Sequence, residues 1–163
     1  MIEVSKAKGS YIYDHKNKRY LDFVAGVSAC SVGHCNKEVI NAIKDQSEMY
    51  MHVMVYGEFV TKPSLELAKL LAKNLPNSLN CTYFTNSGTE ALEGSMKLAR
   101  RFTGRKKIIA AKNAYHGSTM GALTLMGLEE RKKPFAPLIP CLLYIITHLS
   151  ILIKSIVKLH VLC

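Results

Sequence analysis

The sequence predicts an α/β protein built on a mainly parallel sheet. Two repeats of one pattern carry this prediction. A strand-like run at Cys81–Thr85 leads directly into a helical pattern, and a second apolar run at Lys107–Ala111 precedes another helical pattern at Thr119–Leu128. Strands that alternate with helices in this way are typical of βαβ units, in which the crossover is right-handed. The chain has 163 residues, 48% of them hydrophobic, which suits one domain or one domain and part of a second.

A β-hairpin is predicted near the start of the chain. Ser10–Tyr13 and Arg19–Phe23 flank the polar stretch DHKNK. Within that stretch Asn17 suits the tight position of the turn, because asparagine tolerates a positive φ.

Two helices are predicted between this hairpin and Cys81. Asn36 is placed to cap the first, whose apolar residues fall on one face. Pro63 suits the first helical position of the second, and Pro76 ends it. The apolar stripe of this second helix consists of Leu67, Ala68, Leu71 and Leu75.

The segment Ser87-Gly88-Thr89 marks the change from strand to helix. Ser87 followed by Glu90 is a capping-box pattern, and the helix that it opens runs to a stop at Gly104. The free N–H groups at a helix start, the helix dipole, a glycine and two hydroxyl groups together make a plausible phosphate cup. By itself the segment is more typical of an ordinary helix cap. It also lacks the second glycine of a dinucleotide loop and the Gly-Lys pair of a Walker loop.

Tyr115-His116-Gly117 follows the next predicted strand. In a parallel sheet this loop emerges on the same edge as Ser87-Gly88-Thr89. An aromatic ring beside a phosphate cup is what an aromatic phosphate ester requires. A tyrosine and a histidine in a loop are, on their own, more often packing or surface residues.

Charge and cysteine content limit the other classes of function. The formal net charge is +10, from 22 Lys+Arg against 12 Asp+Glu, and half of the excess lies after Glu130. No stacking aromatics interleave with the basic residues, so no nucleic-acid partner is expected. Five cysteines without repeated spacing and the absence of an apolar leader favour a reducing cytoplasm. Cys30, His34 and Cys35 have no fourth ligand at suitable spacing, so no metal site is expected.

Three linked stretches together resemble a known family. They are YIYDHKNKRYLDFVAGVSACSVGH, NSGTEALEGSMKLARRFTGRKKI and AYHGSTMGALTL, and their order and spacing are similar to the N-terminal part of the class-III aminotransferases. These are pyridoxal-phosphate enzymes of fold type I, including acetylornithine, ornithine and 4-aminobutyrate aminotransferases. The resemblance covers about Val4 to Pro140 and specifies the family but no particular substrate.

The resemblance implies roles for five residues. Ser87, Gly88 and Thr89 match the segment that holds the phosphate of pyridoxal 5'-phosphate, and Tyr115 matches the aromatic residue stacked on the pyridine ring, with His116 beside it. Gly33-His34 matches a structural Gly-His of the family. The family also carries an aspartate that pairs with the pyridine nitrogen and a lysine that bonds covalently to the cofactor. Neither has a counterpart in this sequence, so no catalytic residue is assigned.

The resemblance also implies a domain organisation. Residues 1–55 are expected to belong to the small domain or dimer arm, and residues 56–140 to open the large cofactor domain. Residues 141–163 form an apolar tail without family resemblance. Seven Leu and six Ile make up half of the 26 residues from Leu138 to Cys163, with no Gly, Ala, Asp, Glu or Asn. The abrupt change in composition favours translation of this tail out of frame. The two alternative interpretations are a membrane-spanning helix and a C-terminal element that packs on the core.

The expected function is therefore transamination by family resemblance. A small-molecule amino donor would pass its amino group to a 2-oxo acid through pyridoxal phosphate, in a cytoplasmic homodimer, and membrane association is not expected. A chain that carries no cofactor lysine is expected to be a truncated, inactive form. The alternative is a non-enzymatic protein, either membrane-anchored or a basic binding protein, that reuses the same segment.

Overall fold

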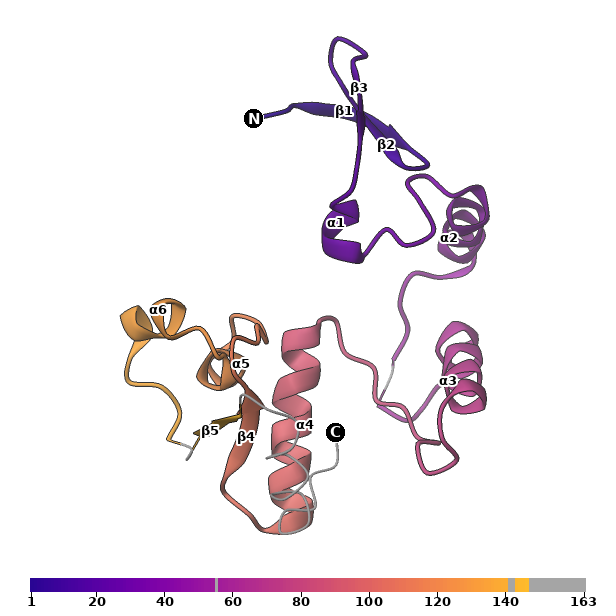
Figure 1. Ribbon diagram of the computed structural model, residues 1–163. Helices are drawn as coiled ribbons and strands as arrows, with labels where there is room; N and C mark the ends of the chain where they lie inside the picture. The colour runs from indigo at the N-terminus through magenta and orange to yellow at the C-terminus, as the bar shows by residue number, and fades with distance from the viewer. Residues whose placement is uncertain (55, 141–142, 147–163) are drawn as a thin grey trace. The chain divides into compact units, whose positions relative to one another are not determined.

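A computed structural model describes residues 1–54, 56–140 and 143–146 (Figure 1). The chain divides into two compact units, Met1–Asn74 and Leu75–Cys163. The boundary expected near residue 55 separates the small and large domains of a complete family member, which differ from these two compact units. That boundary stays a prediction.

The first unit begins with a three-stranded antiparallel sheet. Its strands β1 (Val4–Lys8), β2 (Tyr11–Asp14) and β3 (Arg19–Leu21) lie in the order β1-β2-β3. Strands β2 and β3 confirm the predicted hairpin, and Asn17 in its turn has a φ of 60°. Strand β1 was not predicted, because two lysines in the five residues VSKAK hide any apolar alternation.

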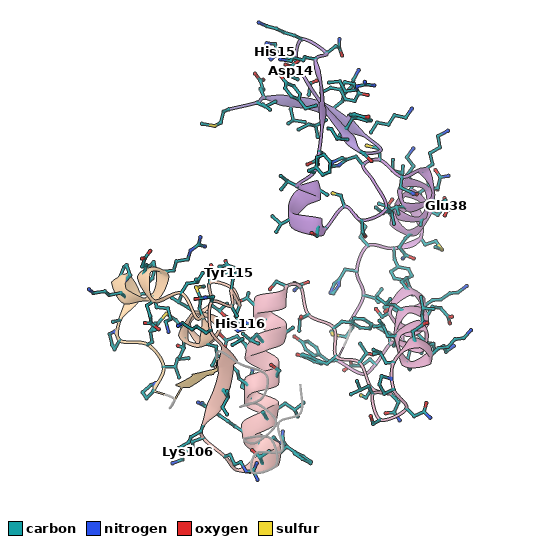
Figure 2. The ribbon with its side chains drawn as sticks, viewed as in Figure 1. Asp14, His15, Glu38, Lys106, Tyr115 and His116 are labelled. Atoms are coloured by element: carbon teal, nitrogen blue, oxygen red, sulfur yellow. The ribbon has the colours of Figure 1, made fainter. Side chains whose placement is uncertain are left out.

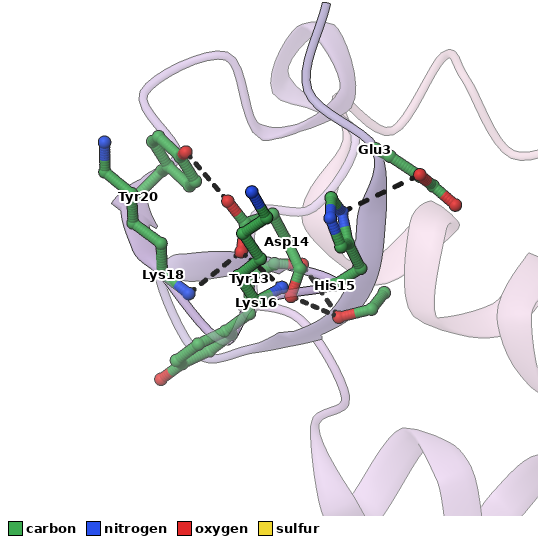
Figure 3. A network of polar contacts seen from close by, with 8 residues as sticks. Glu3, Tyr13, Asp14, His15, Lys16, Lys18 and Tyr20 are labelled. Atoms are coloured by element: carbon green, nitrogen blue, oxygen red, sulfur yellow. Dashed lines mark hydrogen bonds and ion pairs between the residues drawn. The ribbon is translucent and has the colours of Figure 1, made fainter.

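The hairpin turn is organised by the carboxylate of Asp14 (Figure 3). Its Oδ1 accepts hydrogen bonds of 2.9 Å from the backbone N–H groups of Lys16 and Lys18, and its Oδ2 accepts one of 3.0 Å from the Tyr20 hydroxyl. Ser5 on β1 donates to the Asp14 carbonyl oxygen at 2.7 Å. Desolvation raises the pKa of Asp14, but the hydrogen bonds from Lys18, Tyr20 and Lys16 outweigh it and leave the pKa below its ordinary value.

A left-handed turn, assigned as α1 (Ala25–Ser28), follows the sheet. The φ angles of its four residues are 47°, 60°, 56° and 69°, and only Gly26 suits them without steric cost. Asp22 supports the turn, because its Oδ1 accepts from the N–H groups of Val24 and Ala25 at 3.0 and 2.9 Å. Its Oδ2 lies 2.7 Å from Nε2 of His34.

Two helices complete the first unit. Helix α2 (Lys37–Met49) is capped as predicted, with Asn36 Oδ1 accepting from the N–H groups of Glu38 and Val39 at 3.0 and 3.3 Å. Helix α3 (Lys62–Asn74) begins one residue before the position predicted, so that Pro63 is its second residue. No residue of this unit is fully buried in the part that the structure describes.

The second unit centres on a long helix packed against a short parallel sheet (Figure 1). The elements that the structure describes in this unit are α4 (Gly88–Thr103), β4 (Ile108–Ala111), α5 (Met120–Leu125), α6 (Glu129–Lys132), the 3₁₀ helix η1 (Lys133–Phe135) and β5 (Leu143–Ile146). Strands β4 and β5 pair in parallel, Ile108 opposite Leu143, which confirms a parallel sheet. Met96, Ala110 and Leu125 pack together as a buried apolar cluster, and Met126 is also fully buried.

Two predicted elements differ in the structure. Cys81–Thr85 is not a strand, because it has no ladder partner among the described residues. The predicted helix over Thr119–Leu128 ends at Leu125. The chain leaves the helix there because the Gly127 N–H donates to the Ala114 carbonyl oxygen at 2.9 Å.

The apolar tail lies almost wholly outside the described residues. Only Leu143–Ile146 of that segment is described, as strand β5, and the three readings of residues 141–163 stay predictions. Among the residues that the structure describes, no helix is both long and apolar enough to cross a membrane.

Candidate functional site

The first turn of helix α4 presents free backbone N–H groups. Ser87 is the N-cap, in an extended conformation, and its Oγ accepts from the Glu90 N–H at 3.3 Å. Glu90 Oε2 in turn accepts from the N–H of Asn86 at 2.8 Å, one residue earlier than a standard capping box requires. The N–H groups of Gly88 and Thr89 have no acceptor among the described residues. The predicted cap is confirmed, and two donors remain for a ligand.

The loop after β4 carries the predicted aromatic residue. Tyr115 is 58% exposed, its hydroxyl lies 3.3 Å from Ser118 Oγ, and the Arg131 guanidinium lies 5.9 Å from its ring centroid. Nε2 of His116 is enclosed and has no hydrogen-bond partner in the described part of the chain. An enclosed nitrogen without a partner is uncommon in a folded protein, which makes His116 a candidate for contact with a bound molecule.

Hydrogen bonds bring this loop to the start of α4. Thr89 Oγ1 lies 2.8 Å from Thr119 Oγ1 and accepts from the Thr119 N–H at 3.4 Å. Gly117, with a φ of 120°, lies so close to Thr89 that a Cβ on it would collide with the threonine side chain. Figure 2 shows Tyr115 and His116 beside the upper end of α4. The two predicted motifs are therefore neighbours, although Cys81–Thr85 does not form the strand that placed them there.

Glu93 also joins the two motifs, and sequence reasoning missed it. Its Oε1 accepts from the N–H groups of Gly121 and Ala122 at 2.8 and 3.3 Å. A hydrogen bond from the Thr119 side chain and these amides outweigh desolvation, so the pKa of Glu93 lies below its ordinary value. Its partners are 28 and 29 residues away along the chain, so no local pattern reveals the contact.

An open cleft of about 350 Å³ adjoins the capped end of α4. Its lining residues come from the extended segment before the helix and from one face of the helix: Tyr83, Phe84, Thr85, Asn86, Glu90, Glu93, Gly94 and Lys97. Gly88 and Thr89, which carry the free N–H groups, are not among these lining residues, and neither are Tyr115 and His116. A helix start of this kind attracts anions, because the dipole and the unpaired donors act together.

The residues around Gly33-His34 form a different kind of arrangement. His34 is bound to Asp22, and its backbone N–H and C=O pair with Gly9 at 2.8 and 2.9 Å. Within the described residues, no three His, Cys, Asp or Glu side chains come together as metal ligands. The contacts of His34 are those of a structural residue.

Comparison with known proteins identifies the family. The model of the family described as "Aminotransferase class-III" matches residues 1–157, a range that extends past Pro140. The chain is 41% identical over 138 residues to the acetylornithine aminotransferase of Archaeoglobus fulgidus, covering 85% of this chain and 36% of that protein. The chain thus spans about a third of the length of the curated relatives that it matches.

Solved transaminases share the fold. The adenosylmethionine-8-amino-7-oxononanoate aminotransferase of Methanocaldococcus jannaschii superposes with a TM-score of 0.87 and 31% identity, over 97% of this chain and 38% of that one. The taurine:2-oxoglutarate aminotransferase of Bifidobacterium kashiwanohense was solved with pyridoxal phosphate and glutamate. It superposes with a TM-score of 0.76 and 30% identity, over 89% of this chain and 33% of that one. On these matches the chain belongs to the class-III aminotransferases, a family of pyridoxal-phosphate enzymes of fold type I.

Proposed function

We propose that these residues form the cofactor seat of an enzyme that transfers an amino group from a small-molecule donor to a 2-oxo acid, with pyridoxal 5'-phosphate as cofactor. The observation that carries the proposal is the meeting of two motifs: a helix start with two free N–H groups and a tyrosine loop that is hydrogen-bonded to it. Pyridoxal phosphate supplies an electron sink when bound, and the protein supplies binding and orientation.

The start of α4 is the proposed phosphate seat. A Cβ on Gly88 would meet no atom within 4 Å, so the backbone there is open to a ligand. The N–H groups of Gly88 and Thr89 donate to the phosphate, and Ser87 Oγ, which accepts from Glu90, still has its own proton to donate. Thr89 Oγ1 is already shared with Thr119, so the backbone N–H is the main contribution of Thr89.

Tyr115 and His116 are the proposed supports of the pyridine ring. The exposed face of Tyr115 offers an aromatic surface for stacking, with a preference for an offset arrangement. His116 lies beside it with Nε2 enclosed and unpaired in the described residues, a polar group suited to contact with a bound cofactor.

Three finer points belong to the same proposal. The donor is a compound of the kind named in the relatives, such as N-acetylornithine, since several relatives at 35–41% identity are acetylornithine aminotransferases. The protein acts as a homodimer in the cytoplasm, which its family resemblance and the free thiols of Cys30, Cys35 and Cys81 support. The 163 residues alone do not turn over substrate, because they hold no counterpart of the family's cofactor lysine.

A phosphate-dependent binding measurement tests the proposal. Pyridoxine 5'-phosphate and pyridoxine differ only in the phosphate, and neither has an aldehyde that would react with the lysines of the chain. We expect calorimetry to show at least about tenfold tighter binding of the phosphate ester. Ser87→Ala should weaken that binding severalfold, while Ser95→Ala on the same helix, whose hydroxyl donates to the Leu92 carbonyl oxygen, should not. Equal binding of the two compounds would contradict the proposal.

Turnover is measured separately. The 163-residue chain with pyridoxal phosphate, N-acetylornithine and 2-oxoglutarate should release no glutamate above the rate without protein. Sustained glutamate formation would refute the proposed inactivity and leave the proposed phosphate seat intact.

A further inference from the structure

Glu93 links helix α4 to helix α5 through its carboxylate. It lies one turn after Thr89 on α4, so both side chains project from the same face of the helix. On that face the Glu93 carboxylate accepts hydrogen bonds from the N–H groups of Gly121 and Ala122. Thr89 Oγ1 accepts one from the Thr119 N–H. Helix α4 therefore provides the acceptors for the beginning of α5.

Helix α5 has no cap of its own. Its N-cap, Thr119, makes no side-chain bond to the helix that it opens, and the helix is only six residues long. So short a helix does not hold itself together, and its first N–H groups need acceptors. A carboxylate at this end also interacts favourably with the helix dipole. Glu93 thus does for α5 what a local cap does for most helices.

The packing leaves little freedom at this junction. A Cβ on Gly121 would collide with the Glu93 carboxylate, as one on Gly117 would collide with Thr89. Both glycines lie where the loop and α5 meet α4, so the backbone approaches the α4 side chains directly. Loss of the Glu93 carboxylate would leave the N–H groups of Gly121 and Ala122 without their acceptor at this close contact.

We infer that Glu93 is a positioning residue for the cofactor site, because it fixes the loop of Tyr115 and His116 against the first turn of α4. The inference rests on the proposed function and adds a residue to it that touches neither phosphate nor ring. The loop has two anchors: Ala114, whose carbonyl oxygen accepts from the Gly127 N–H at 2.9 Å, and Thr119 with the start of α5. Without the Glu93 contacts the second anchor is held only by the two bonds between Thr119 and Thr89, so Tyr115 and His116 gain freedom to move relative to the phosphate seat.

A role in positioning differs from a role in stability alone. If Glu93 only stabilised the fold, the affinity of the folded molecules for cofactor would not change on its substitution. If it positions the loop, affinity falls even when the chain is fully folded, and the N–H groups of Gly121 and Ala122 become exposed to exchange with solvent.

The test compares Glu93→Gln with the matched change Glu66→Gln, at an exposed glutamate on α3 that pairs with Lys69. Binding of pyridoxine 5'-phosphate is measured by calorimetry at a temperature where circular dichroism shows all variants folded. Amide exchange at Gly121 and Ala122, and the chemical shifts of Tyr115 and His116, are measured by NMR without ligand. For Glu93→Gln we expect about tenfold weaker binding, about tenfold faster exchange at both amides and shifted loop signals, since a charged acceptor is lost. Glu66→Gln should match the wild type.

The outcomes separate this inference from the proposed function. Unchanged affinity and loop signals in Glu93→Gln, with a wild type that binds, overturn the inference and leave the proposed function standing. Failure of the wild type to bind overturns the proposed function and, with it, the positioning role. If Glu93→Gln does not fold, the same measurements are made on Glu93→Asp. This variant keeps the negative charge, but its side chain is too short to reach both amides. Wild-type affinity for pyridoxine 5'-phosphate in Glu93→Asp overturns the inference.

Discussion

Thr89 and Thr119 share a hydrogen bond of 2.8 Å between their side-chain oxygens, although 30 residues separate them. The bond joins the first turn of α4 to the start of α5, on either side of the loop that carries Tyr115 and His116. The first turn of α4, which is the proposed phosphate seat, and the aromatic loop are therefore parts of one structure inside the second unit. All of the residues in these contacts belong to the second unit.

Replacing Thr89 by valine should loosen this arrangement at nearly constant volume. The variant loses the bond to Thr119 Oγ1 and the acceptor of the Thr119 N–H, which should lower the free energy of unfolding by about 1–2 kcal/mol. Urea denaturation followed by circular dichroism measures the change. The control is Thr103→Val at the far end of α4, whose hydroxyl bonds locally to the Ala99 carbonyl oxygen. Equal affinity for pyridoxine 5'-phosphate in Thr89→Val and wild type would speak against the coupling of loop and seat.

Two glycine-to-alanine changes should act with opposite signs. Gly117→Ala places a methyl group against Thr89 at a φ of 120°, so it should destabilise the second unit and weaken cofactor binding. Gly94→Ala lies in the interior of α4, where a Cβ meets no atom within 4 Å, and should stabilise by about 0.5–1 kcal/mol. Thermal unfolding of both variants beside the wild type provides the measurement. A stabilised Gly117→Ala variant would show that the close approach to Thr89 does not exist.

The cap of α2 is expected to contribute to the first unit. Asn36→Ala removes the acceptor of two N–H groups at the helix start and should cost about 1 kcal/mol. Asn74→Ala is the control, since Asn74 sits at the last position of α3, where its amide donates to the Leu70 carbonyl oxygen. Helicity followed in increasing urea should fall earlier for Asn36→Ala; identical curves for both variants would rule out the cap as a source of stability.

Acid should destabilise the first unit through Asp22. The hydrogen bond from His34 is the main reason that the pKa of Asp22 lies below its ordinary value, and the Ala25 N–H adds to it. Because the pKa is lowered on folding, the contribution is fully present above the unfolded value of about 3.9 and is lost as pH falls through the folded pKa. Urea midpoints measured between about pH 6 and 2 should therefore drop at the acid end of this range.

The matched variants isolate that contribution. Asp22→Asn should flatten the acid part of the profile, whereas Asp45→Asn, at an exposed position on α2, should keep the wild-type shape. If both variants retain the full acid-induced drop, the pairing of Asp22 with His34 is not its source.

The sequence predicted those features that local chemistry decides. Asn17 in the hairpin turn, Asn36 at the start of α2, and Ser87 and Gly104 at the two ends of α4 all take the predicted places. Each acts within four residues of its own position, through a side-chain cap or through tolerance of a positive φ. Helix caps and turns of this kind can therefore be predicted from the local sequence, without knowledge of the rest of the fold.

Features that depend on distant partners were missed. Cys81–Thr85 has the composition of a strand, yet a strand exists only with a neighbour to bond, and none of the described residues provides one. Glu93 looks like any polar residue of an amphipathic helix until α5 is placed beside it. The left-handed turn at Ala25–Ser28 is equally hidden, because three of its four residues disfavour a positive φ and Asp22 supports it from outside.

The most direct test of the cofactor seat is an amide NMR titration of the ¹⁵N-labelled chain with pyridoxine 5'-phosphate. The seat at the start of α4 predicts that the Gly88 and Thr89 N–H signals move downfield first and furthest, with smaller shifts at Tyr115 and His116, and that pyridoxine leaves Gly88 and Thr89 unmoved. Shifts confined to the basic residues at the other end of α4, such as Arg101 and Arg105, with Gly88 and Thr89 unchanged, would contradict it.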